Sequence, residues 1–246
     1  METPPPPLDS TAVLELLQYG ELTLQGQFTH GSNYTFLGKV VGAQGSVRVV
    51  YKPRRGEQPL WDFPTGTLTR REVAAYLFSE LLGWSLVPPT IYRRKAPAGP
   101  GSLQEFIPYD PQYHYFSFTA EDRQRLRPAA LFDLLINNAD RKGSHILADA
   151  NGRLWLIDHG VCFNVEDKLR TVIWDFAGEP FPADLAADVK RVLPRLSAGE
   201  DGFTVLKPYL RVSEIGALVR RARRLLDTGV YPPPPEDRRA FPYPPL

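Results

Sequence analysis

The fold class is decided by residues 131–163, which read LFDLLINNADRKGSHILADANGRLWLIDHGVCF. The pattern predicts a helix, a polar loop, a short apolar strand, a turn and a second strand. Two carboxylates, Asp140 and Asp158, stand at the ends of the apolar runs. Apolar runs normally exclude charge, so other groups must stabilise both carboxylates. The alternative interpretation is an ordinary helix, loop and hairpin with two solvated aspartates.

The spacing of the polar residues in this stretch matches the layout of a kinase-type phosphoryl-transfer site. In such a site one aspartate accepts the proton of the attacking hydroxyl, a later side chain binds a metal, and a second aspartate holds the metal against the phosphates. Asp140, His145 and Asp158 occupy these three positions. Lys142 lies two residues after Asp140, where it would neutralise charge on the transferred group.

Two motifs in this stretch carry a resemblance, FDLLINNADR at residues 132–141 and LIDHG at residues 156–160. They resemble the phosphatidylinositol 3-/4-kinase-like superfamily, and within it the type II phosphatidylinositol 4-kinases and their poorly characterised bacterial relatives. The resemblance covers roughly residues 26–163. It implies an α+β, two-lobed, protein-kinase-like fold with an antiparallel N-terminal sheet and a mostly helical C-terminal lobe. It also implies ATP and either Mg²⁺ or Mn²⁺ as cofactors.

The sequence departs from this superfamily at two positions. His145 stands where the superfamily has asparagine, and an imidazole nitrogen is a poor ligand for Mg²⁺ but a better one for Mn²⁺ or Zn²⁺. Four explanations of His145 therefore stay open. The site prefers a metal other than Mg²⁺, His145 contacts only phosphate, the site is degenerate, or His145 has a purely structural role. Lys142 stands where type II lipid kinases usually carry glycine, so the acceptor remains a lipid, a protein or a small molecule.

The region before residue 108 is predicted to form an antiparallel sheet. Alternating residues predict strands over 22–29, 34–41 and 46–52, joined by turns of small residues. Residues 30–36 resemble the phosphate-covering loop of type II phosphatidylinositol 4-kinases, which implies that Ser32 and Asn33 contact the nucleotide. Backbone N–H groups in a turn of small residues can approach phosphate oxygens closely. A plain hairpin turn is the alternative.

Lys52 ends the third strand, where a kinase carries the lysine that binds the α- and β-phosphates. A helix is predicted to open at Thr69 and to run to about Leu82. The kinase interpretation pairs Glu72 of this helix with Lys52, and Glu80 is the competing partner. The alternatives are an edge-strand lysine and a capping box formed by Thr69 and Glu72.

Two further strands are predicted over 90–95 and 102–107, and the resemblance implies that the second contains the hinge between the lobes. In a kinase the hinge binds the edge of the adenine through backbone atoms. Gln104 and Ile107 are the hinge residues expected here. Helical periodicity dominates after the hinge. We expect a proline-rich lead-in over residues 1–8, an N-terminal lobe over 9–107, a C-terminal lobe over 108–230 and a proline-rich tail over 231–246.

Composition excludes several classes of protein. The 246 residues carry a net charge of +1, so no overall field attracts nucleic acid. No apolar run approaches the about 18 residues that a transmembrane helix needs. The N-terminal residues lack a basic region and an apolar core, so we expect no signal peptide and a cytoplasmic protein. Cys162 is the one cysteine, which excludes a disulfide within this chain and predicts a small buried residue.

These features predict an ATP-dependent phosphotransferase that acts on a hydroxyl of an unidentified acceptor. Two other functions remain open. One is a pseudokinase, which would bind partners with or without a nucleotide, and the other is a kinase-fold enzyme that transfers AMP. His145 favours the pseudokinase, whereas the presence of Lys52, Asp140 and Asp158 together favours an active enzyme.

Overall fold

The computed structural model describes residues 8–28 and 34–246, and these residues form two compact units. The first unit contains residues up to 69 together with 88–106, and the second contains 70–87 together with 107–246. The expected nucleotide-contacting residues Ser32 and Asn33 lie outside the described residues. Residues 70–87 group with the second unit, whereas the sequence analysis assigned them to the N-terminal lobe.

The first unit contains a five-stranded sheet in which every neighbouring pair is antiparallel. The strand order is β1-β2-β3-β5-β4. The strands are β1 (Glu21–Gln27), β2 (Phe36–Gly42), β3 (Gly45–Pro53), β4 (Thr90–Arg93) and β5 (Gly101–Glu105). The antiparallel N-terminal sheet expected from the sequence is therefore confirmed.

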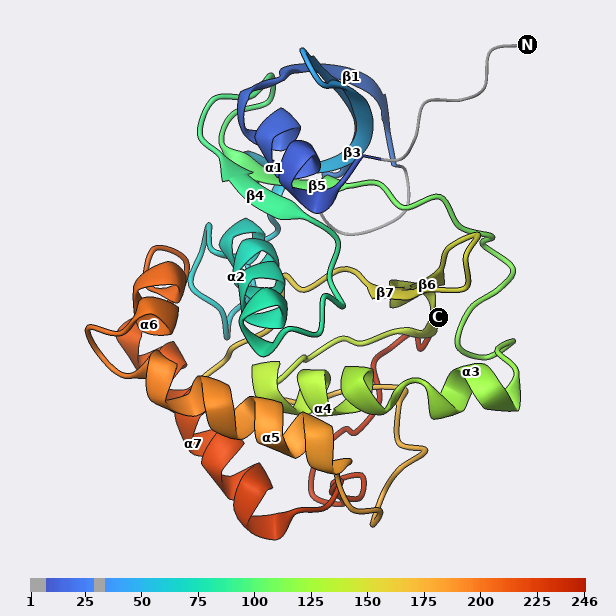
Figure 1. Ribbon diagram of the computed structural model, residues 1–246, viewed down its shortest axis with the longest axis vertical. Coiled ribbons are helices and arrows are strands. Elements are labelled where there is room, and N and C mark those ends of the chain that lie inside the picture. Colours follow the sequence, from blue (N-terminus) through green and yellow to red (C-terminus); the bar gives the residue numbers. More distant parts are fainter. Residues whose placement is uncertain (1–7, 29–33) are drawn as a thin grey trace. The chain divides into compact units, whose positions relative to one another are not determined.

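Helix α1 (Ser10–Tyr19) packs against this sheet (Figure 1). It begins at Asp9, whose carboxylate accepts a hydrogen bond from the Ala12 N–H at 2.8 Å and satisfies one of the free donors of the first turn. Apolar residues three to four apart face the sheet, as expected for an amphipathic helix. The core that results contains Val13, Leu16, Leu17, Val40, Val49, Tyr51, Ala98 and Leu103.

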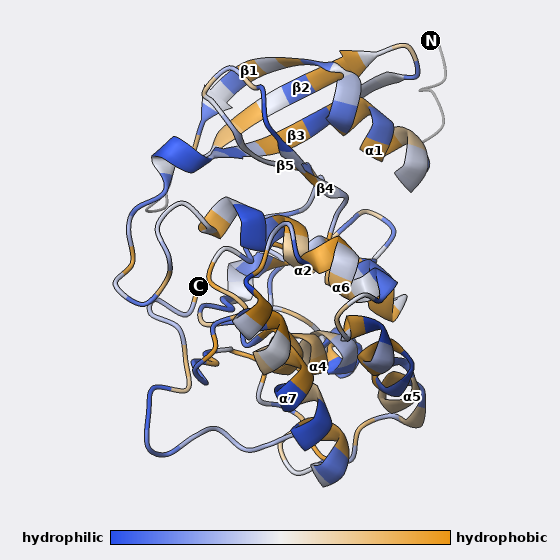
Figure 2. Cartoon of the chain, turned by 90° about the vertical axis from the view of Figure 1, so that its left-hand side faces the viewer, coloured by the Kyte–Doolittle hydropathy of each residue, from blue (hydrophilic) through white to orange (hydrophobic). Residues whose placement is uncertain are grey.

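The second unit is mostly helical, as the sequence predicted. Its helices are α3 (Ala120–Gln124), α4 (Arg127–Ile136), α5 (Ala183–Val192), α6 (Asp201–Leu206) and α7 (Val212–Thr228), and α2 (Leu68–Leu82) enters it from the first unit. A hairpin of β6 (Ile146–Ala148) and β7 (Leu154–Leu156) completes it. Figure 2 shows apolar and charged residues alternating along α7, which packs on both α4 and α5. None of the helices in the described ranges is both long and apolar enough to cross a membrane.

A buried arginine holds α2 to the rest of the second unit. The Arg71 guanidinium pairs with the Glu214 carboxylate of α7 and donates to the Cys162 carbonyl at 2.6 Å. Arg71 is 1% exposed and Glu214 is 5% exposed, so this charge pair is shielded from solvent. Cys162 is buried, as predicted. These contacts explain why residues 70–87 belong to the second unit.

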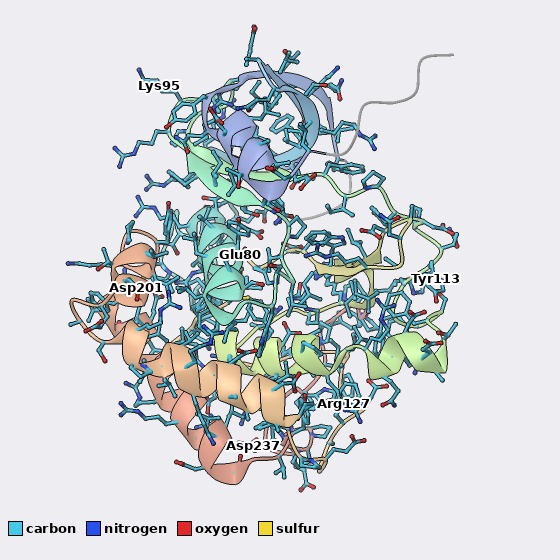
Figure 3. The ribbon with its side chains drawn as sticks, in the orientation of Figure 1. Glu80, Lys95, Tyr113, Arg127, Asp201 and Asp237 are labelled. Carbon is cyan, nitrogen blue, oxygen red and sulfur yellow. The ribbon has the colours of Figure 1, made fainter. Side chains whose placement is uncertain are left out.

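The proline-rich residues 231–246 are bound along the second unit. The Tyr231 hydroxyl donates to the Arg127 carbonyl at 2.9 Å, and Figure 3 labels Arg127 at the start of α4. The Ala240 carbonyl accepts from the Thr171 N–H at 3.1 Å, and the Pro245 carbonyl accepts from the Gly143 N–H at 2.8 Å. The tail therefore reaches the loop that carries Asp140.

We predict that Leu17→Ala lowers the free energy of unfolding by about 2–5 kcal/mol, because it removes a fully buried side chain from the core beneath α1. Tyr19→Ala, on the same helix but 80% exposed, is the matched control and should change it by less than about 0.5 kcal/mol. Urea unfolding followed by circular dichroism measures both. Equal effects would contradict the packing of α1 on the sheet.

Candidate active site

Two asparagines turn the chain from α4 into the loop at Asp140. Asn137 adopts a left-handed backbone with φ 54°, a conformation that asparagine tolerates better than most residues, and this ends the helix. The Asn138 side-chain carbonyl accepts the Asp140 N–H at 3.0 Å, and its amide donates to Asp133 at 3.0 Å. The position of Asp140 is therefore fixed by its own backbone and by buried polar neighbours.

The Asp140 carboxylate lies beside a cation and near a second carboxylate. Its Oδ2 is 3.7 Å from the Lys142 ammonium nitrogen. Burial raises the pKa of Asp140 to about 6; Lys142 acts to lower it and the charge of Asp158 acts to raise it further. The side chain is still 37% exposed, so solvent weakens both charge interactions. Asp140 and Asp158 therefore act on one another within the second unit.

The two residues expected to bind a metal lie next to each other. His145 Nε2 is 3.3 Å from the Asp158 Oδ2. His145 ends the short turn Gly143–His145, and its Nδ1 accepts the Lys142 N–H at 3.4 Å. Because Nδ1 acts as the acceptor, the imidazole proton is assigned to Nε2, which faces Asp158.

The backbone at Asp158 is in the left-handed region with φ 61°, which is uncommon for a residue other than glycine. Hydrogen bonds hold the residues on both sides of it. The Ile157 N–H donates to the His145 carbonyl at 3.0 Å, and the His159 N–H donates to the Glu72 carboxylate at 2.8 Å. The surrounding contacts therefore determine the direction of the Asp158 side chain.

Glu72 lies on α2, and its carboxylate accepts the His159 N–H, next to Asp158. The capping box is not formed, because Thr69 lies inside the helix and both its N–H and its hydroxyl donate to Glu57. Glu80 is exposed on the same helix (Figure 3). Lys52 stands on β3 opposite Ser102 of β5. Lys52 and Glu72 belong to different units, so their pairing stays a prediction.

The two expected hinge residues are both buried. The Gln104 side-chain amide donates to the Thr90 hydroxyl at 2.8 Å, within the sheet of the first unit. Ile107 is 8% exposed and is the residue at which the second unit resumes. Because a hinge would use backbone atoms, these side-chain positions leave the adenine-binding role as a prediction.

The sequence analysis missed a buried polar cluster beneath the two carboxylates. Asp133 and Arg141 are both fully buried and form an ion pair with Arg141 Nε 2.9 Å from Asp133 Oδ2. His159, also fully buried, lies 2.8 Å from Arg141 Nη2 through its Nε2. Asp133 interrupts an apolar helical run, and a buried charge requires a partner, so the reasoning applied to Asp140 and Asp158 would have singled out Asp133, although not Arg141 as its partner.

The donor set at His145 and Asp158 suits a metal that is shared with phosphates. Within the described residues, no group of three or more histidine, cysteine, aspartate and glutamate side chains is placed to hold a metal ion. Mg²⁺ at nucleotide sites usually takes one or two carboxylates and completes its coordination with phosphate oxygens and water. The Asp158 carboxylate fits this arrangement. The His145 imidazole fits it through Nε2 once its proton moves to Nδ1, which then no longer accepts the Lys142 N–H, and a nitrogen donor favours Mn²⁺.

Comparisons with known proteins identify relatives that match different shares of this chain. No protein-family model matches it. The chain is 40% identical over 264 residues to protein Rv2133c of Mycobacterium tuberculosis, and the match covers 93% of this chain and 94% of that protein. It is also 32% identical over 138 residues to phosphatidylinositol 4-kinase gamma 4 of Oryza sativa subsp. japonica, covering 48% of this chain and 24% of the plant protein. The Arabidopsis thaliana protein of the same name is 29% identical over 190 residues, 65% of this chain and 33% of its own length.

The plant proteins confirm the resemblance to phosphatidylinositol 4-kinases that the motifs carried. The chain spans 24% and 33% of those two proteins, so the match concerns part of each of them.

Solved structures with a similar fold are kinases and kinase-like proteins. Hydra Fam20 with sugar has a TM-score of 0.56 and 17% identity, over 88% of this chain and 87% of its own. The Golgi casein kinase with Mn/ADP bound has a TM-score of 0.56 and 14% identity, over 89% and 74%. The Helicobacter pylori proinflammatory kinase CtkA has a TM-score of 0.53 and 11% identity, over 87% and 94%. At these identities the likeness shows the fold, which is kinase-like as predicted.

We predict that Asp140→Asn raises the melting temperature of the metal-free protein at about pH 8 more than at about pH 4. Because the folded pKa of about 6 exceeds the ordinary 3.8, the folded state holds the proton more tightly, and stability from this group is lost as the pH rises through about 6. Asparagine stays neutral and avoids this loss. Thermal melting of both proteins across this pH range, with EDTA present, measures the difference.

Asp149→Asn is the matched control, with an effect of opposite sign. Burial acts to raise the pKa of Asp149, but hydrogen bonds from the Trp155 side chain and from the Arg153 and Asn151 N–H groups outweigh it and lower the pKa. Asp149 therefore contributes stability above its unfolded pKa, and Asp149→Asn should lose stability in neutral solution. A melting difference for Asp140→Asn that does not vary with pH would contradict the assignment.

Proposed function

We propose that this chain, which belongs to the same family as the Mycobacterium tuberculosis protein Rv2133c, is an ATP-dependent phosphotransferase. In the proposed reaction the γ-phosphate of ATP passes to a hydroxyl acceptor with the help of a divalent metal ion. One observation carries the proposal: the Asp140–Lys142 and His145–Asp158 pairs lie in one unit of a kinase-like fold, and the charge of Asp158 acts on Asp140.

Asp140 is the proposed proton acceptor. Its carboxylate takes the proton of the acceptor hydroxyl as that oxygen bonds to the γ-phosphorus, the bond to the β,γ-bridging oxygen breaks, and ADP leaves with that electron pair. A general base works best when its pKa lies near the operating pH, and burial raises the pKa of Asp140 to about 6. Lys142, 3.7 Å from Asp140, would offset negative charge on the transferred group.

Asp158 and His145 are the proposed holders of the metal ion, which when bound neutralises charge on the phosphates. The Golgi casein kinase, a fold neighbour, has a structure with Mn/ADP bound. The imidazole of His145 is the feature that would favour Mn²⁺ over Mg²⁺.

The remaining nucleotide contacts are proposed from the resemblance. Lys52 would bind the α- and β-phosphates with Glu72 as its partner, Ser32 and Asn33 would cover the phosphates, and backbone atoms between Gln104 and Ile107 would bind the adenine. The acceptor is a hydroxyl-bearing lipid, protein or small molecule, and the plant relatives are phosphatidylinositol 4-kinases by name.

His145 also favours a second candidate, a pseudokinase that binds nucleotide without transferring phosphate. Its imidazole contacts Asp158 directly, where the superfamily has an asparagine. Labelled ATP separates the candidates. Transfer of a γ-label to a lipid extract, a protein extract or water indicates a phosphotransferase, transfer of an α-label indicates AMP transfer, and binding without either indicates a pseudokinase.

We predict that ATP with Mn²⁺ raises the melting temperature of the wild-type protein and that Asp158→Asn loses most of this increase. The variant removes the negative charge that would hold the ion, so the metal should bind more weakly and contribute less to nucleotide binding. Asp149→Asn, in the adjacent hairpin, is the control and should keep the wild-type response. A full response in Asp158→Asn would exclude Asp158 as a metal ligand.

His145→Asn should shift the metal preference toward Mg²⁺, because it replaces a nitrogen donor with the amide oxygen that Mg²⁺ prefers. The dissociation constant of ATP, measured by calorimetry with each metal in turn, gives the Mn²⁺-to-Mg²⁺ ratio for both proteins. An identical ratio in wild type and His145→Asn would show that His145 is not a ligand and would favour its structural or phosphate-contacting role.

A further inference from the structure

We propose that Arg141 is a positioning residue that holds the Asp140 loop and the Asp158 loop in the relative arrangement required to bind metal and nucleotide. This inference rests on the proposed function. Arg141 is fully buried and touches neither carboxylate directly, so it acts through the backbone and side chains that carry them.

The guanidinium of Arg141 uses all five of its N–H groups. Nε and Nη2 donate to the Asp133 carboxylate at 2.9 and 3.0 Å. Nη1 donates to the His145 carbonyl at 3.2 Å and to the Ile157 carbonyl at 2.8 Å. The second Nη2 proton points to His159 Nε2 at 2.8 Å. One rigid planar group therefore joins α4, the turn at His145 and both sides of Asp158.

The contact with His159 also fixes the orientation of its imidazole. Arginine can only donate, so His159 Nε2 is the acceptor of this hydrogen bond. The backbone N–H of the same residue donates to Glu72 at 2.8 Å. His159 is thus held at two points, by α2 through its backbone and by Arg141 through its side chain.

Asp158 depends on these contacts because its own conformation is unfavourable. Its φ of 61° lies in the left-handed region, where a residue other than glycine is held only by its surroundings, and its side chain is 48% exposed. Arg141 binds the carbonyl before it and the imidazole after it. Without this pair of bonds, the backbone at Asp158 would keep the bonds made by the Ile157 and His159 N–H groups but would lose two of the restraints that direct its carboxylate toward His145.

Arg141 also restrains Asp140, because the two residues are neighbours in the main chain. The Arg141 N–H donates to the Arg170 carbonyl at 2.9 Å, and the Arg141 carbonyl accepts the Val172 N–H at 3.1 Å. The Arg141 side chain is therefore held by Asp133, and the Arg141 backbone is held by Arg170 and Val172. Arg141 is adjacent to Asp140, so a shift of the guanidinium would displace both proposed functional carboxylates together.

Lysine cannot replace this arginine. An ammonium has three donors on a flexible stem, whereas the site contains a carboxylate, two carbonyls and an imidazole arranged around a planar fork. Arg141→Lys keeps the positive charge beside buried Asp133 and so removes geometry rather than charge. This makes it the most informative substitution.

The test measures the metal enhancement of nucleotide binding, defined as the dissociation constant of a β,γ-imido ATP analogue in EDTA divided by that in saturating Mn²⁺. Calorimetry gives both values without turnover. Arg141→Lys should reduce the enhancement about 10-fold or more, the cost typical of losing a residue that orients a metal ligand, while binding in EDTA stays close to wild type.

Arg221→Lys is the matched control. Arg221 is also buried in the second unit, and it donates to the Leu135 carbonyl at 3.1 Å and to the Asn164 carbonyl at 3.0 Å, but it contacts neither loop at Asp140 or Asp158. The Arg221→Lys variant should be less stable than the wild-type protein but should keep the wild-type metal enhancement of nucleotide binding. Equal loss in both variants would reduce Arg141 to a general structural role and overturn the inference, as would an unchanged enhancement in Arg141→Lys.

A second pair of variants answers the question if Arg141→Lys does not fold. His159→Leu removes the acceptor for Nη2, and His159→Gln supplies an amide oxygen close to the position of Nε2. The enhancement should fall in the first and return in the second, and equal values in both would overturn the inference. A wild-type protein that binds no nucleotide under any metal condition would instead overturn the proposed function, and the role of Arg141 with it.

Discussion

The structure around the proposed active site depends on the ion pair between Asp133 and Arg141. Both side chains are fully buried, and moving two charges out of water is costly unless each satisfies the other and the remaining donors find acceptors. Here the remaining donors bind the backbone of His145 and Ile157. The requirement that a buried guanidinium be fully hydrogen-bonded therefore determines how two separate loops meet.

Much of the fold follows from local pattern. Alternation predicted the strands that became β1, β2 and β3, and the apolar pattern after residue 131 predicted the helix that became α4, because these patterns act over a few residues. The grouping of residues 70–87 with the second unit could not be predicted this way. It arises from contacts such as Arg71 with Glu214, which are 143 positions apart in the sequence. Periodicity carries no information about such a distant partner.

The proposed site was predictable where its residues are close in sequence. Asp140, His145 and Asp158 lie within one helix–loop–hairpin, so spacing alone placed them, and the structure brings His145 and Asp158 together. Arg141 and His159 were missed because their contacts with each other and with the backbone of His145 and Ile157 depend on the folded structure. The contact between Glu72 and the His159 N–H was missed for the same reason. Every residue except proline has a backbone N–H, so the residue type does not show which N–H group a carboxylate will bind.

The course of residues 231–246 has a practical consequence for work with this protein. The Pro245 carbonyl is one hydrogen bond from Gly143, and the Ala240 carbonyl accepts from Thr171 and from the Trp174 indole at 3.3 Å. A fluorescent label attached near Pro245 would therefore lie beside Gly143, in the loop that also carries Asp140 and Lys142. Removal of this segment by a protease would leave four N–H groups without their acceptors, those of Gly143, Thr171, Gly178 and the Trp174 indole, and would loosen the neighbouring loops.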